Sequence, residues 1–123
     1  MTPLAVVTVI TAGAVGAVAR YLLASSLAGW GRVPWAVVVV NVVGSFAAGT
    51  ALGLPLDPVV QLIIVSGFCG GLTTFSTLAV ETVQLVLSGK RRAAALSVTL
   101  NVALGLCAAL LGVALGVTLA GTS

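Results

Sequence analysis

The segment Gly67–Thr77, GFCGGLTTFST, places three glycines and four hydroxyl side chains in an otherwise apolar run. Glycine lowers the cost of leaving helical geometry, and hydroxyl groups can bond the backbone groups that a broken helix releases. Released carbonyls can coordinate a cation, and the N-terminus of a half-helix can face an anion. Glycines alone would indicate only close helix packing. Together with the hydroxyl groups, they predict a functional break at Gly70-Gly71 and the residues that follow.

Polar and small residues also recur at helical spacing in three other apolar runs. They are Gly13, Gly16 and Arg20 in the first, Asn41, Gly44, Ser45 and Ala48 in the second, and Ser97, Asn101 and Gly105 in the last. Residues three or four apart share one face of a helix, so each set forms a stripe. Each Asn alone can simply join two helices. A cation such as Arg20, several residues inside a span, usually faces a bundle interior or water, although it can also snorkel.

The ionisable residues are few, which excludes several kinds of function. The chain has no histidine, and its only acids are Asp57 and Glu81. A metal site built from side chains and a nucleophile–base pair are therefore both hard to assemble. The net charge of +3 gives nucleic-acid binding no support, and Glu81 is the only candidate for proton coupling. Neutral donors with one cation suit a small anion, which the positive edge of the Phe75 ring can also meet.

The elements that must position these residues are membrane spans. The 123 residues are 60% hydrophobic and 6% charged, with mean hydropathy +1.31, which is more apolar than a soluble bundle requires. We predict an all-α membrane protein, a single unit over residues 1–123. Its four transmembrane helices are expected at roughly Leu4–Leu27, Trp35–Leu54, Pro58–Leu87 and Ala93–Leu119. The third, continuous, would be ~45 Å long against a hydrocarbon core of ~30 Å, an excess that tilt or a break can absorb.

Three motifs together resemble the fluoride channel family known as Fluc or CrcB. They are GFCGGLTTFST followed by Glu81, NVVGSFAAG from Asn41 to Gly49, and GAVGAVARYLL around Arg20. The resemblance covers all four spans in order. It implies four-helix subunits in a bacterial plasma membrane, assembled as antiparallel, dual-topology-type dimers with two pores through which toxic fluoride leaves the cell passively. It also implies a structural sodium ion at the dimer centre, held by backbone carbonyls from both broken third helices.

The resemblance assigns roles to individual residues by their motif positions. Asn41 matches the residue that hydrogen-bonds fluoride, and Phe75 matches the first of two phenylalanines whose ring edges face the anion. Thr74 and Ser76 match positions near the pore or the break. The other matched positions are Arg20 near the pore vestibule, Gly70 in the glycine pair, Gly71 to Thr74 as the segment whose carbonyls would hold sodium, and Glu81 after the motif.

The chain departs from the family pattern at two places along the expected fluoride pathway. Leu78 stands where the family carries its second phenylalanine. In the last span, Ser97 stands where many members carry a tyrosine, and Asn101 and Gly105 stand where serines often follow. Each family pore takes one phenylalanine position from each subunit. A homodimer of this chain would therefore pair Phe75 with Leu78 in both pores, whereas a heterodimer with a complete relative would keep one intact pore.

The positive charges of the loops predict how the chain is oriented. Arg32 lies in the first loop, and Lys90, Arg91 and Arg92 lie in the third, while the opposite side has only Asp57 and the termini. Short loops rich in Lys and Arg face the cytoplasm, so both termini are expected outside. We hypothesise that this subunit inserts in one orientation and works with an oppositely oriented paralogue.

Three other functions remain to be weighed. A small four-helix multidrug-type transporter needs a proton-coupling glutamate in its first helix, where this chain has Arg20. A non-transporting membrane scaffold would explain the glycines but not Phe75, Asn41 and the hydroxyl groups in register. An enzyme lacks the acid–base pairs that it would need.

Overall fold

The computed structural model describes residues 2–27 and 34–121, and these are helical apart from short connections. Four helical stretches are long and apolar enough to cross a membrane: α1 (Pro3–Ser26), α2 (Trp35–Gly53), the third span (Pro58–Leu87) and α6 (Arg91–Gly121). Every bound lies within two residues of the predicted one, so the four predicted spans are confirmed. Arg32, on which part of the orientation prediction depends, lies outside the described residues.

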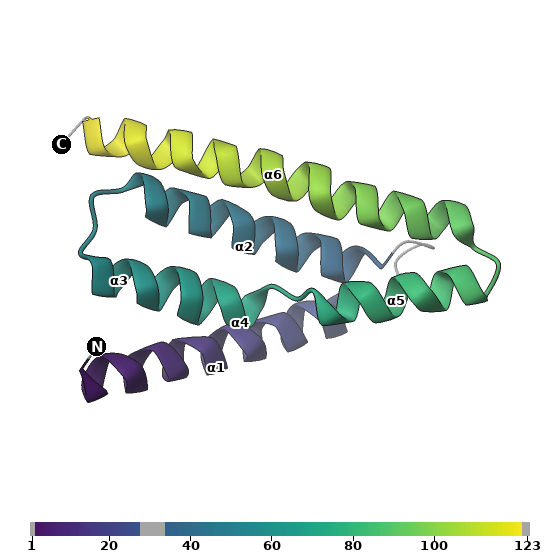
Figure 1. Ribbon diagram of the computed structural model, residues 1–123, viewed down its shortest axis with the longest axis horizontal. Helices are drawn as coiled ribbons and strands as arrows, with labels where there is room; N and C mark the ends of the chain where they lie inside the picture. Colours follow the sequence, from purple (N-terminus) through teal and green to yellow (C-terminus); the bar gives the residue numbers. More distant parts are fainter. Residues whose placement is uncertain (1, 28–33, 122–123) are drawn as a thin grey trace.

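The four spans form two pairs, as Figure 1 shows. α1 packs against the first part of the third span, and α2 packs along α6. The members of each pair run in the same direction, and the two pairs run in opposite directions. The start of α1 and the end of α6 consequently lie at the same end of the bundle (Figure 1).

Two of the spans begin at polar residues that cap them, each followed by a proline. The Thr2 hydroxyl accepts a hydrogen bond from the Ala5 amide at 3.1 Å, and the Asp57 carboxylate accepts one from the Val59 amide at 2.9 Å. Side-chain caps of this kind satisfy N–H groups that have no partner in the first helical turn. Proline suits the next position because it has no N–H to satisfy there.

The third span is built from four helical pieces with an interruption between the last two. α3 (Pro58–Leu62) continues into the π-helix η1 (Ile63–Cys69) and the short α4 (Gly70–Leu72). The chain then leaves helical geometry, with Thr73 extended at φ −79° and ψ 158°. α5 (Ser76–Leu87) completes the span. The third span is thus interrupted, as predicted, whereas the π-helix was not anticipated.

The glycine pair is not itself the break, which corrects the predicted position. Gly70 and Gly71 lie inside α4, and residues 73–75 form the interruption. A Cβ atom added to Gly71 would collide with the carbonyl group of Gly13 on α1. Gly16 makes a similar close approach to the main chain of Phe68. These glycines therefore bring α1 against the third span, and the hydroxyl residues downstream leave the helix.

α2 and α6 are held together through small residues in the same way. Cβ atoms added to Gly49 and Gly53 would meet the main chain of α6, and those added to Gly112 and Gly116 would meet the main chain of α2. Close approach of this kind is how membrane helices gain packing contacts where lipid provides no hydrophobic driving force.

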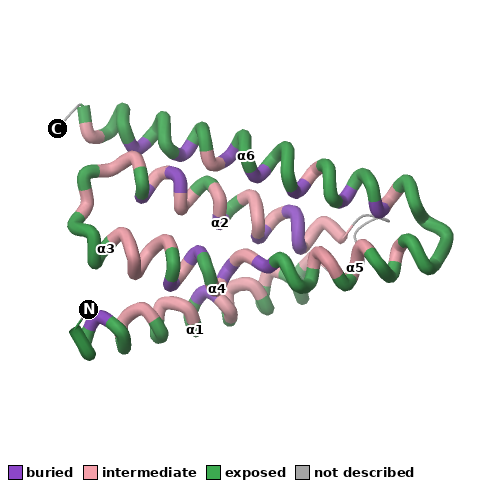
Figure 2. The backbone as a smooth tube through the Cα atoms, viewed as in Figure 1, coloured by how far each residue is buried: buried purple, intermediate pink, exposed green. Residues whose placement is uncertain are grey.

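Buried and exposed residues separate by face, as Figure 2 shows. Buried residues lie where helices face one another, and large apolar side chains such as Leu110 and Leu111 on α6 are exposed. Lipid can cover such side chains, so a bundle with an apolar exterior is what a membrane span requires.

Candidate functional site

The interruption of the third span is fastened to α2 by the side chain of Asn41. Its Oδ1 accepts a hydrogen bond from the Thr74 amide at 2.8 Å, and its Nδ2 donates to the Thr74 carbonyl at 3.1 Å. One carboxamide thus satisfies both main-chain groups of a residue that has left the helix. Such pairing is required where backbone is interrupted at membrane depth.

Asn41 is held in turn by α6. Its Nδ2 donates a second hydrogen bond to Oδ1 of Asn101 at 2.7 Å, and Asn101 Nδ2 donates to the Ser97 carbonyl one turn earlier at 2.8 Å. Asn101 is buried, and Ser97 is fully buried with no hydrogen-bond partner for its hydroxyl group. The polar stripe predicted on the last span therefore faces α2 and reaches the interruption through Asn41.

Hydroxyl groups satisfy the start of α5, as the sequence predicted. The Thr74 hydroxyl accepts a hydrogen bond from the Thr77 amide at 3.2 Å and donates to the Thr77 hydroxyl at 3.1 Å. It also lies 3.4 Å from the hydroxyl oxygen of Ser76. Thr74 acts as a helix cap, because its oxygen takes an amide that would otherwise lack a partner.

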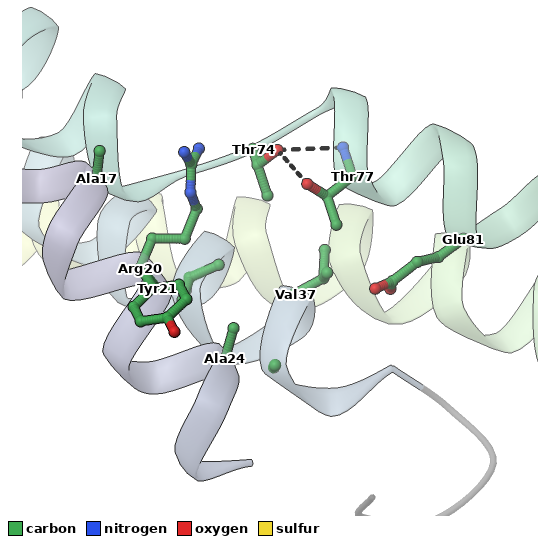
Figure 3. A pocket seen from close by; sticks show the side chains of 10 residues that line it. Ala17, Arg20, Tyr21, Ala24, Val37, Thr74, Thr77 and Glu81 are labelled. Atoms are coloured by element: carbon green, nitrogen blue, oxygen red, sulfur yellow. Dashed lines mark hydrogen bonds between the residues drawn. The ribbon is translucent and has the colours of Figure 1, made fainter. Parts of the chain in front are cut away.

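One cavity, of about 250 Å³, lies between α1, α2 and α5, and we call it the α1-side cavity. Its polar lining residues are Arg20, Tyr21, Thr74, Thr77 and Glu81, and Figure 3 shows them from close by. Arg20 donates a hydrogen bond to the Thr73 carbonyl at 3.4 Å. Glu81 has one buried carboxylate oxygen with no hydrogen-bond partner. The cavity therefore holds one cationic side chain and one acidic side chain within a mostly apolar bundle.

A second cavity, of about 320 Å³, is bounded by α2, the interruption, the start of α5, and α6. We call it the α6-side cavity. It is lined by Asn41, Ser45, Thr73, Thr74, Phe75, Leu78, Asn101 and Val102. The Phe75 side chain is 80% exposed, so its ring stands at the surface of this subunit. Thr74 belongs to the walls of both cavities.

The structure brings most of the predicted site residues to these two cavities. Asn41, Phe75, Leu78 and Asn101 line the α6-side cavity, Arg20 and Glu81 line the α1-side cavity, Thr74 lines both, and Ser76 contacts Thr74. Ser97 lies behind Asn101, Gly71 packs on α1, and Gly70 is exposed. Tyr21 is a lining residue that sequence reasoning missed, and its only signal was its place next to Arg20.

Main-chain oxygens at the interruption have the donor chemistry to hold a metal ion. No group of three or more His, Cys, Asp or Glu side chains lies together in the described part of the chain. Because α4 ends before the interruption, the Gly71 carbonyl lies beyond the helical hydrogen-bond ladder. The Thr74 carbonyl accepts one side-chain amide and has a second lone pair. Both fit a hard cation by donor type, whereas the Thr73 carbonyl faces Arg20.

The amino-acid sequence of this chain is similar to those of known proteins. The family model "CrcB-like protein, Camphor Resistance (CrcB)" matches residues 7–113. A fluoride-specific ion channel FluC 1 from Yersinia pseudotuberculosis is 45% identical over 97 residues, which cover 74% of this chain and 76% of the relative. A fluoride-specific ion channel FluC from Methanopyrus kandleri is 48% identical over 101 residues, covering 78% and 76%. One from Roseiflexus sp. is 41% identical over 108 residues, covering 82% and 87%.

Proposed function

This chain belongs to the CrcB-like protein family, and from that premise we propose that it is a subunit of a fluoride-specific ion channel through which cytoplasmic fluoride leaves the cell passively. The family match confirms the family that the motifs predicted. The family is one of channels rather than enzymes. The four spans of this chain belong in the cell membrane.

The observation that carries the proposal is the α6-side cavity beside the interruption. It collects amides, hydroxyl groups and the Phe75 ring within an apolar bundle. Neutral donors and a ring edge can replace part of the hydration of a small anion without binding it so tightly that it cannot leave. Arg20, bonded to the main chain of the same interruption, adds positive potential. We assign the fluoride pathway to Asn41, Thr74, Phe75, Ser76, Leu78, Ser97, Asn101 and Arg20.

We propose that a second, antiparallel subunit covers the exposed ring of Phe75. The ring is 80% exposed on one subunit, and a second subunit would enclose the α6-side cavity, which a conduit for an ion requires. Leu78 lies in the wall of the same cavity as Phe75. A paralogue that supplies a second phenylalanine would therefore complete a pore better than another copy of this chain.

We propose that Gly71 and Thr74 contribute main-chain oxygens to a structural sodium ion at the centre of that dimer. Two carbonyls are fewer than a cation bound by carbonyls takes, so the remaining oxygens would come from the second subunit. When bound, the ion would neutralise carbonyl dipoles left by the interruption. Thermal stability measured in sodium and in N-methylglucamine buffers tests this, and equal melting midpoints would contradict it.

Fluoride release from liposomes tests the proposed function directly. The purified protein is reconstituted with internal potassium fluoride, a potassium ionophore clamps the voltage, and an electrode follows external fluoride. We expect rapid release of fluoride and none of chloride in a parallel measurement. If neither this chain alone nor its mixture with a co-purified paralogue releases fluoride, the channel proposal is wrong, and a scaffold role or a multidrug-type transporter becomes the better account.

A further inference from the structure

The hydrogen bonds around Asn41 form a chain in which every bond has a fixed direction. The Thr74 amide donates to Asn41 at 2.8 Å, Asn41 donates to Asn101 at 2.7 Å, and Asn101 donates to the Ser97 carbonyl at 2.8 Å. A main-chain amide can only donate and a main-chain carbonyl can only accept. The two ends of the chain therefore determine which way both carboxamides between them point.

The Asn41 carboxamide has no spare N–H group in this arrangement. It has two N–H groups, of which one goes to the Thr74 carbonyl and the other to Asn101 Oδ1. An anion that meets Asn41 in the α6-side cavity would find both donors in use. Asn101 lines the same cavity, so its oxygen and the anion would compete for one N–H.

We propose that Asn101 is a positioning residue that turns the Asn41 carboxamide toward Thr74 and reserves one Asn41 N–H, which an anion must take from it. The part that concerns an anion rests on the proposed function, whereas the part that concerns Thr74 does not. Burial makes the chain effective, since Asn101 is 7% exposed and Thr74 is 9% exposed. Hydrogen bonds between groups this buried are stronger than in water and polarise one another.

A different account is that Asn101 merely joins α6 to α2. That account predicts an effect of Asn101 substitutions on overall stability but none that is specific to the Thr74 amide. It also predicts no change in the concentration of fluoride at which conduction saturates. The two accounts therefore differ in measurements that can be made on the whole chain.

Amide hydrogen exchange in fluoride-free buffer tests the positioning role. The full chain in detergent micelles is compared with Asn101→Leu, which keeps the side-chain volume but removes the acceptor and the donors. We expect the Thr74 amide to exchange roughly 10-fold faster, as the loss of one buried hydrogen bond implies. Leu104→Ala is the control, because Leu104 is 41% exposed on the same helix and lines neither cavity; it should leave Thr74 exchange within about twofold.

Concentration-dependent fluoride flux tests the reserved N–H. In Asn101→Leu the anion no longer competes with an Asn101 oxygen, so we expect the half-saturating fluoride concentration to fall by up to ~10-fold. If Thr74 exchange changes but half-saturation does not, the reserved N–H is refuted and only the positioning role stands. If exchange at Thr74 stays within twofold of wild type, the proposal is overturned.

Two further outcomes are distinguishable. Should Asn101→Leu fail to fold, Asn101→Ser is used, because its shorter hydroxyl cannot span the same distance and should raise Thr74 exchange in the same direction. Should the wild-type chain release no fluoride, alone or with a paralogue, the channel proposal fails. The exchange measurement still decides whether Asn101 positions Asn41.

Discussion

At the scale of single residues, Asn41 has a structural role in addition to its proposed contact with fluoride. Both N–H groups of its carboxamide and one lone pair of its oxygen are in use, two of these three bonds with the main chain of Thr74 and one with Asn101. The loss of conduction in an Asn41 variant would therefore have two physical causes, a missing donor for the anion and an unfastened interruption. Measuring stability together with flux separates these causes.

Replacing Asn41 with Asp removes both N–H groups and keeps an acceptor for the Thr74 amide. The new carboxylate would face the Thr74 carbonyl and Asn101 Oδ1, and its charge would repel fluoride. We expect fluoride release from liposomes to stop and the free energy of unfolding in detergent to fall by about 2 kcal/mol. Val43→Thr, a change of similar shape at an exposed position of α2, is the control. Unchanged flux would remove Asn41 from the pathway.

Replacing Phe75 with Ile tests the ring edge without disturbing the subunit. The side chain is 80% exposed, so its loss should change the melting midpoint of a monomer little. An aliphatic side chain has no positive edge to present to an anion, and we expect the initial rate of fluoride release to fall by about 10-fold or more. Equal rates in the two proteins would refute the edge contact.

At the scale of elements, main-chain contact at glycine determines how closely the helices pack. α1 meets the third span through Gly13, Gly16 and Gly71, and α2 meets α6 through a second set of glycines. The interruption lies just beyond the first of these contacts, so α1 holds the helix before the break while Asn41 holds the break itself. The consequence is that the two cavities depend on helix spacing as much as on their lining residues.

Two glycines of α6 provide a matched test of this packing. A Cβ atom added to Gly112 would lie 2.8 Å from the Thr50 amide nitrogen, whereas one added to Gly105 would come no nearer than 3.6 Å, to the Ser45 hydroxyl oxygen. We expect Gly112→Ala to lower the free energy of unfolding by about 1–3 kcal/mol. Gly105→Ala should be neutral or stabilising by up to about 1 kcal/mol, because alanine favours a helix. Equal melting midpoints for the two variants would contradict the packing account.

At the scale of the whole molecule, the four spans place both ends of the described chain at the same end of the bundle (Figure 1). At the opposite end, Lys90 lies in the connection after α5, and Arg91 and Arg92 lie in the first turn of α6; all three are exposed. Cytoplasmic loops carry such clusters. A subunit with this asymmetry should insert in one orientation and would then need a differently oriented partner for an antiparallel dimer.

Reporter fusions at the C-terminus measure that orientation. We expect an external reporter in nearly all molecules, since the basic cluster should stay in the cytoplasm. Changing Lys90, Arg91 and Arg92 to Gln should make the cytoplasmic and external populations more nearly equal. Equal populations in the unchanged chain would count against the fixed orientation and hence against the need for a paralogue.

The cavity wall also predicts how a partner changes conduction. Leu78 lines the α6-side cavity together with Phe75, and in the proposed dimer it stands at the second phenylalanine position, which each subunit would contribute to the pore opposite its own Phe75. We expect co-expression with an oppositely oriented paralogue to restore growth in fluoride that this chain alone does not support. Leu78→Phe should raise the flux of the complex by opening a second complete pore. Full resistance from the unchanged chain alone would show that Leu78 is tolerated.

The sequence by itself determined the four spans and the family. Hydropathy adds up along a run of residues, so the bounds of α1, α2, α6 and the third span are local properties that need no knowledge of partners. The Gly67–Thr77 segment was equally informative, since hydroxyl groups after a glycine pair are unusual enough to predict a break. Asn41, Phe75, Leu78 and Asn101 were named from spacing and motif, and the structure brings them to one cavity.

Only the tertiary structure decided how those residues are used. Gly71 was expected in the break and lies instead within α4. Its lack of a side chain lets the Gly13 carbonyl of α1 approach closely, which the sequence does not reveal. The direction of the Asn41 carboxamide depends on Thr74 and Asn101, which are 33 and 60 residues away along the chain. Hydrogen bonding and close packing join residues that are distant in sequence, and the energy of each contact exists only once the helices are assembled.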